Sequence, residues 1–180
     1  TTAEDFWKDL EVSLKYLGYI DIYQFHNPSF CPKPDDGSGL YEAMLQAKAE
    51  GKIRHVGMSF HDSARVLDKI LSQRPEIEVV QLQLNYADWD DPKVQSRKCY
   101  EVCRKHGKPV IVMEPVKGGK LAQMSEDALA VYKELGDMSP ASYAIRFVAG
   151  HEGVMMTLSG MGNMEMMNDN ISFMQDFQSL

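Results

Sequence analysis

Polar or small residues follow four segments that have the apolar composition of buried strands. They are His26, Ser59, Asn85 and Gly160. A histidine in such a position can donate a hydrogen bond to a substrate carbonyl, or it can be satisfied by a neighbouring backbone carbonyl, and position alone weights the two equally. Barrel enzymes build their sites from the ends of many strands at once, so the repeated pattern favours a barrel.

A long amide, Gln81, lies within the largely apolar residues 79–84. Such a side chain must find hydrogen-bond partners when it is buried, so it requires either a bound carboxamide or an internal polar network. The sequence leaves both interpretations open.

Two further segments have the composition of anion sites. Gly160, Gly162 and Asn163 precede a predicted helix, whose free N–H groups and dipole favour an anion, although an ordinary helix start explains them nearly as well. Residues 117–120, Lys-Gly-Gly-Lys, suit either a loop around a pyrophosphate or a solvated loop.

The elements that must position these residues alternate along the chain. Strands are predicted at residues 20–25, 53–58, 79–84, 109–113 and 154–158. Helices are predicted between them, one of them starting with Asp91 and Pro92 as N-cap and first helical residue. The final helix starts near Asn163 and turns Met164, Met167, Ile171 and Met174 inward.

Apolar strands separated by helices predict an α/β fold with a parallel sheet covered on both faces. An open doubly wound sheet and a (β/α)8 TIM barrel both have this pattern. We favour the barrel, because the polar residues lie at several strand ends and the first turn lacks a glycine-rich motif. Eight strands need more than 180 residues, so we expect residues 1–180 to form a single domain that is a partial barrel of about the last five β/α units.

Composition excludes several classes of protein. The 19 basic and 26 acidic residues give a net charge of −7, which argues against nucleic-acid and membrane partners. Neither a membrane-spanning run nor a signal-peptide layout is present, and the odd, scattered cysteines Cys31, Cys99 and Cys103 predict buried thiols in a reducing cytoplasm. The histidines lack convincing ligand spacing, so we expect no metal.

Five segments in register resemble the aldo-keto reductase family. They are LEVSLKYLGYIDIYQFHNP, AKAEGKIRHVGMSFHD, VVQLQLNYAD, GKPVIVMEPVKGGKLA and TLSGMGNMEMMNDNI, which follow the family's order over nearly the whole chain. The segment MEPVKGGKLA is most similar to the subgroup of the family in which an iron-sulfur module follows the barrel. No C-x-x-C-x-x-C run occurs here, so such a module would lie beyond Leu180.

The resemblance implies roles for individual residues. His26 corresponds to the histidine that orients the substrate carbonyl, while Ser59 and Gln81 correspond to the residues that bind the nicotinamide carboxamide. The remaining positions implied to contact the cofactor are Met113, Glu114, Pro115, Val116, Gly160, Gly162, Asn163, Asp169 and Asn170.

Three positions depart from the family pattern. Phe60 replaces a common asparagine, Met113 replaces the aromatic ring that stacks on the nicotinamide, and Met166 replaces the arginine that holds the adenosine 2'-phosphate. The resemblance therefore implies NADP or NAD as the cofactor without choosing between them.

The family's catalytic aspartate, tyrosine and lysine come from the first three β/α units, and the matched segments begin after the third. We therefore expect the last five units of an NAD(P)-dependent oxidoreductase that reduces aldehydes or ketones, inactive when the chain is alone. The alternative is a non-catalytic nucleotide-binding or interaction protein of the same fold. In either case, the end strands predict self-association through open sheet edges.

Overall fold

The computed structural model describes residues 2–26 and 38–180, and the chain divides into two compact units, Thr1–Gln81 and Leu82–Leu180. Cys31 and the loop predicted after His26 fall outside the described residues. A single domain over residues 1–180 remains a prediction.

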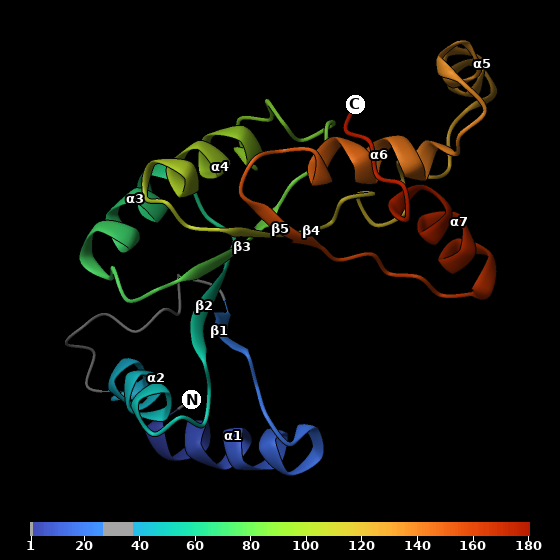
Figure 1. Ribbon diagram of the computed structural model, residues 1–180. Coiled ribbons are helices and arrows are strands. Elements are labelled where there is room, and N and C mark those ends of the chain that lie inside the picture. The colour runs from blue at the N-terminus through green and yellow to red at the C-terminus, as the bar shows by residue number, and fades with distance from the viewer. Residues whose placement is uncertain (1, 27–37) are drawn as a thin grey trace. The chain divides into compact units, whose positions relative to one another are not determined.

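The first unit alternates helices and strands (Figure 1). In chain order it contains α1 (Ala3–Leu17), β1 (Ile22–His26), α2 (Leu40–Ala49), β2 (His55–Phe60), α3 (Ala64–Gln73) and most of β3 (Val79–Gln83). A capping box starts α1: Thr2 Oγ1 accepts from the backbone N–H of Asp5 at 3.2 Å, and Asp5 Oδ2 accepts from that of Thr2 at 2.9 Å. The predicted elements of this unit are confirmed, with boundaries shifted by a few residues.

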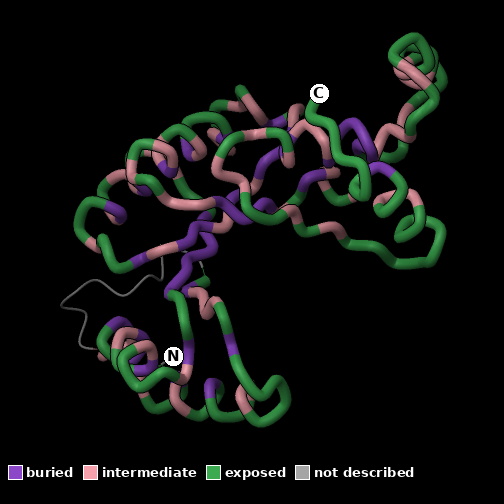
Figure 2. Tube along the Cα trace, viewed as in Figure 1, coloured by how far each residue is buried: buried purple, intermediate pink, exposed green. Residues whose placement is uncertain are grey.

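The core of the first unit lies where α1 and α2 pack with the strands. Phe6 and Leu10 of α1 meet Met44 and Ala47 of α2 and Val56 of β2 in one buried cluster. Figure 2 shows β2 as a largely buried strand. This rigid strand carries Ser59 near its carboxyl end.

The second unit begins with the last residues of β3 and contains more helix. Its elements are α4 (Ser96–Lys105), β4 (Val110–Met113), α5 (Glu126–Leu135), α6 (Pro140–Ala149), β5 (Val154–Thr157) and α7 (Met164–Met174). The helix α6 buries Ile145 and Val148, whereas α5 has no buried residue. Cys99 and Cys103 are buried as predicted, and burial raises the pKa of the Cys103 thiol to about 12, so this thiol stays protonated.

Two sequence predictions about this unit were wrong. Helix α4 starts at Ser96 instead of Pro92, because Asp91 Oδ1 accepts from the backbone N–H groups of Lys93 and Val94 and closes a separate turn. On α7, Met164, Met167, Ile171 and Met174 are 39–65% exposed instead of inward, and Phe173 is the residue that this helix buries. Helix α7 contacts α6, and the strand before it, β5, is the last in the sheet among the described residues.

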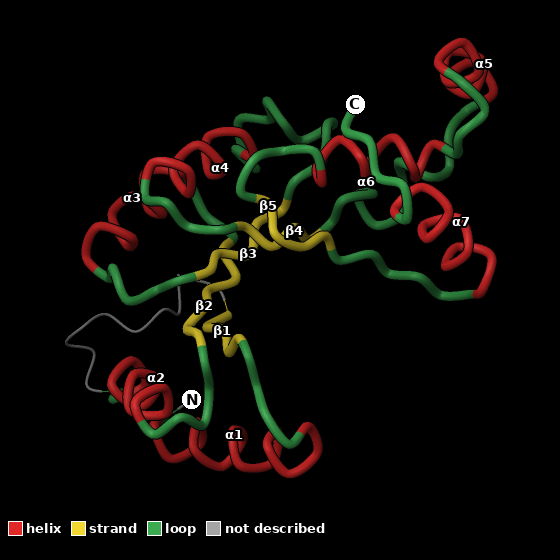
Figure 3. The backbone as a smooth tube through the Cα atoms, in the orientation of Figure 1, coloured by secondary structure: helices red, strands yellow, loops and turns green. Residues whose placement is uncertain are grey.

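The five strands, drawn in yellow in Figure 3, form one sheet in the order β1-β2-β3-β4-β5. The β1–β2 and β4–β5 pairs are both parallel. This confirms the α/β prediction, and β1 and β5 are the end strands. Across residues 2–26 and 38–180, no helix combines the length and the apolar character that a membrane crossing requires.

Glu78 joins three elements of the first unit. Its Oε2 accepts from Lys48 Nζ at 2.5 Å and from the backbone N–H of Val56 at 3.0 Å, while Oε1 lies 3.0 Å from His55 Nδ1. Burial opposes ionisation of this carboxyl, but the three contacts outweigh it and lower the pKa of Glu78 from 4.5 to about 2. The ionised carboxylate therefore stabilises the folded unit.

We expect Glu78→Gln to lower the free energy of unfolding at neutral pH by about 1–2 kcal/mol, after solvent screening of a side chain that is 31% exposed. The folded pKa lies below the unfolded one, so this contribution is present above pH 4.5 and is lost as the pH falls towards 2. Urea unfolding of both proteins across this pH range measures the difference. A difference that did not shrink at low pH would contradict the assignment.

Candidate functional site

Two predicted site residues of the first unit lie side by side at the carboxyl ends of adjacent strands. His26 is the last residue of β1 and pairs in register with Ser59 of β2. Ser59 does not cap the next helix, because the N-cap of α3 is Ser63. Instead, Ser59 Oγ lies 3.3 Å from Nε2 of His61.

His61 joins these two residues into one cluster. Its ring centroid lies 5.3 Å from that of His26, with the rings 63° apart. Burial, and then the neighbouring His26, lower the pKa of the His61 imidazole, which favours its neutral form. Sequence reasoning weighed His61 only as a metal ligand, although its place two residues after Ser59 was a signal for this contact.

Gln81 belongs to an internal polar pair. Its Oε1 accepts from Nε2 of Gln24 in β1 at 3.3 Å. The other end of that amide, Gln24 Oε1, is buried and has no hydrogen-bond partner among the residues that the structure describes. A buried acceptor without a donor is unfavourable, and the N–H2 group of a carboxamide would satisfy it. Both interpretations of Gln81 thus keep support, and Gln24 joins the candidate site although the sequence did not single it out.

The second unit contains a cavity of about 400 Å³. The loop after β4 lines one part of it, and the segment from the end of β5 to the start of α7 lines another. The predicted residues among its walls are Glu114, Pro115, Val116, Gly160, Asp169 and Asn170, and they share the cavity with Ile145, Met161 and Met166. The volume is in the range of small-molecule sites, about 300–1,000 Å³.

The polar residues around α7 are held in place by short hydrogen bonds. Asn170 Nδ2 donates to Ser159 Oγ at 2.9 Å, and Asp169 Oδ2 accepts from Ser139 Oγ at 2.6 Å. Asn163 caps α7, where its Oδ1 accepts from the backbone N–H of Met166 at 2.9 Å. Asn163, Gly162 and Met113 are not among the residues that line the cavity.

The sequence left residues 117–120 as either a loop around a pyrophosphate or a solvated loop, and the structure gives Lys117 a partner within the second unit. The Lys117 ammonium forms an ion pair with Asp88, a carboxylate that is 2% exposed. Burial opposes ionisation of Asp88, but hydrogen bonds from Lys117, Asn85 and Gln83 outweigh it and lower the pKa of this carboxyl. No sequence pattern predicted this network, which depends on two turns meeting in space.

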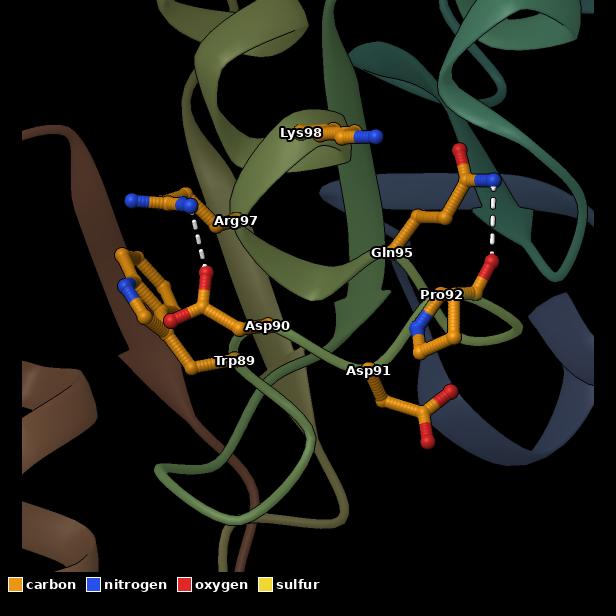
Figure 4. Close-up of a pocket in the computed structure, with 7 residues that line it drawn as sticks. All are labelled: Trp89, Asp90, Asp91, Pro92, Gln95, Arg97 and Lys98. Atoms are coloured by element: carbon orange, nitrogen blue, oxygen red, sulfur yellow. Dashed lines mark hydrogen bonds and ion pairs between the residues drawn. The ribbon is translucent and has the colours of Figure 1, made fainter.

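A second hollow, of about 270 Å³, lies at the start of α4 (Figure 4). Its polar groups pair with one another: Arg97 Nη2 lies 2.5 Å from Asp90 Oδ1, and Gln95 Nε2 donates to the Pro92 carbonyl at 3.1 Å. These contacts stabilise the turn before α4. We therefore place the candidate site at the residues around His26 and Ser59 in the first unit, and at the cavity of about 400 Å³ in the second unit.

Comparison with known proteins shows the family of the chain. The model of the family described as "Aldo/keto reductase family" matches residues 1–178. Over 122 residues the chain is 28% identical to the NADH-specific methylglyoxal reductase of Escherichia coli (strain K12), covering 67% of this chain and 36% of that protein. The chain thus spans little more than a third of this curated relative.

Solved structures show the same fold. The aldo-keto reductase AKR11C1 from Bacillus halodurans (holo form) matches with a TM-score of 0.74 and 22% identity, covering 99% of this chain and 61% of that one. An aldo/keto reductase from Klebsiella pneumoniae in complex with NADP and acetate matches with a TM-score of 0.70 and 21% identity, covering 93% and 58%. These likenesses confirm the predicted fold class, an α/β fold similar to aldo-keto reductase TIM barrels.

Proposed function

Because the chain belongs to the aldo/keto reductase family of NAD(P)-dependent oxidoreductases, we propose that it supplies the dinucleotide-binding part and the carbonyl-orienting histidine of a reductase for aldehydes or ketones. The cavity of about 400 Å³ in the second unit is the observation that carries this proposal. The E. coli relative, named for methylglyoxal reduction with NADH, makes small carbonyl compounds the first substrates to test.

The residues present suit a nicotinamide dinucleotide. In the second unit, the glycine-containing loop after β4 and Asn170 offer backbone and amide groups around the cavity. In the first unit, Ser59, Gln81 and the unpartnered Gln24 Oε1 offer hydrogen-bonding groups that suit a carboxamide. When bound, the reduced dinucleotide supplies the hydride that the carbonyl carbon accepts.

His26 would orient the carbonyl by donating a hydrogen bond to its oxygen, where negative charge develops as the hydride arrives. Its neighbour His61 lies close enough to limit the orientations of the His26 ring. Ser59, in register with His26, would place the carboxamide beside this point. A fixed hydrogen-bond donor at His26 and a fixed nicotinamide carboxamide would together set the geometry of hydride transfer.

We expect the chain to bind NADH or NADPH, and Asn170→Ala to weaken binding about tenfold through loss of a hydrogen-bonding group in the cavity. Titration followed by protein fluorescence or calorimetry measures the dissociation constants. Gln175→Ala is the matched control, since this amide lies just after α7 and outside the cavity. Absence of saturation by either dinucleotide up to about 1 mM would contradict the proposal.

A further inference from the structure

The loop after β4 holds an unusual series of backbone conformations. Glu114, Lys117, Gly118 and Gly119 have φ of 57°, 50°, 60° and 88°. This left-handed region suits glycine but is unfavourable for residues that carry a side chain. Two of the four are not glycine, so the surrounding structure must hold Glu114 and Lys117 in place.

A buried carboxylate supplies that support. Asp88 accepts hydrogen bonds from Asn85 Nδ2 at 2.8 Å and Gln83 Nε2 at 2.9 Å, and it forms the ion pair with Lys117. The same Asn85 amide also donates to the carbonyl of Glu114 at 3.1 Å. Asp88 therefore acts on both strained positions, directly at Lys117 and through Asn85 at Glu114.

The loop presents its other residues to the cavity. Glu114, Val116, Gly118 and Gly119 line the cavity, while Lys117 lies between them in sequence and turns its ammonium to Asp88. The ion pair with Asp88 thus anchors the loop at Lys117, while the neighbouring residues Val116 and Gly118 line the cavity.

We propose that Asp88 is a positioning residue for the dinucleotide: through Asn85 and Lys117 it holds residues 114–119 in the conformation that receives the cofactor. This inference rests on the proposed function of the cavity. A loop ordered before binding has no ordering cost to meet when the ligand arrives. If the loop instead reached this conformation only about a tenth of the time, the apparent affinity would fall about tenfold.

The first test uses Asp88→Asn, which keeps the shape of the side chain and removes its charge. We expect NADH to bind about tenfold more weakly and, without dinucleotide, the backbone amides of residues 117–122 to exchange hydrogen faster. The matched control is Asp90→Asn, the same change two residues along at a carboxylate that is 67% exposed, which should alter neither measurement.

A double-mutant cycle separates this role from direct contact between Lys117 and a phosphate. We expect Lys117→Met to weaken binding as Asp88→Asn does, and the double variant to bind no more weakly than the worse single variant. A direct phosphate contact gives another pattern, in which Asp88→Asn frees the ammonium and leaves affinity unchanged or higher, while Lys117→Met weakens binding in both backgrounds.

Normal affinity or unchanged loop exchange in Asp88→Asn would overturn the positioning role alone. Failure of the unaltered chain to bind either dinucleotide would contradict the proposed function, and the positioning role with it. Unfolding curves for each variant check that a loss of affinity does not come from loss of the fold.

Discussion

On its own, the chain of 180 residues is expected to reduce no aldehyde or ketone above the background rate with either NADH or NADPH. Reduction needs a proton for the carbonyl oxygen as well as a hydride, and a well-placed general acid contributes about 10²–10⁴-fold to the rate. The family resemblance assigns this proton to a tyrosine from β/α units that precede the matched segments. His26 alone would orient the carbonyl without completing the reaction.

The tyrosines that sit in or just after strands do not replace that acid. Burial, and then the hydrogen bond to Tyr132, raise the pKa of the Tyr86 hydroxyl well above its usual value, and the two hydroxyl oxygens lie 2.7 Å apart. Burial also raises the pKa of Tyr23, whose ring packs edge-on against Phe6 at 5.7 Å between centroids. A raised pKa makes both hydroxyls poorer proton donors.

Dinucleotide oxidation measured with methylglyoxal and several other carbonyl compounds tests this expectation. His26→Ala should show the same background rate as the unaltered chain, since no catalysed reaction remains to be lost. Turnover of about 1 per second or more would contradict the assignment, because that is an ordinary enzyme rate. In a protein that joins this chain to units supplying the tyrosine, aspartate and lysine, the same His26→Ala change should lower the rate.

Gly57→Ala is expected to lower the free energy of unfolding by about 1–3 kcal/mol, because it overpacks the contact between β1 and β2. A Cβ at Gly57 would lie 2.9 Å from Cγ of Gln24 and 3.1 Å from Cγ2 of Ile22. Gln24 would have to move, and its hydrogen bond to Gln81 would break. The substitution should therefore also weaken dinucleotide binding.

A double variant tests whether this clash is the cause. Gln24→Ala together with Gly57→Ala should recover part of the stability that Gly57→Ala loses, because the nearest colliding atom, Gln24 Cγ, is removed while the contact with Ile22 Cγ2 remains. Denaturant unfolding of the two single variants and the double variant gives the coupling free energy. Simple additivity of the two single effects would show that Gly57 matters for another reason.

The sequence predicted those features that depend on local patterns. Apolar runs identified the strands, and Asn163 identified the start of α7. The start of α4 was wrong because Asp91 has the residue type of a helix cap, and only the chain geometry shows that it closes a turn. The sequence pattern alone does not distinguish an aspartate that caps a helix from one that closes a separate turn.

Among the site residues, those that belong to local motifs were predicted, and some that depend on contacts in space were not. Family motifs pointed to His26, Ser59 and the cavity residues, since these lie at strand ends and helix starts. Gln24 and Asp88 were missed because their importance comes from the contacts of Gln24 with Gln81, 57 residues apart in sequence, and of Asp88 with Lys117, 29 apart. His61 was missed although its partner Ser59 lies two residues away. Inward α7 methionines were predicted from periodicity, which identifies an apolar face without saying whether a neighbour covers it.

The strand order in the sheet is also the order of the strands along the chain. Each strand consequently finds its partner in the β/α unit that was synthesised just before it. For example, Ile22 pairs with His55 across the connection that contains α2, and the entropy lost on closing such a connection grows only slowly with its length. During translation, a ribosome that releases the chain from its N-terminus can add one unit at a time to an existing sheet edge, without waiting for distant segments.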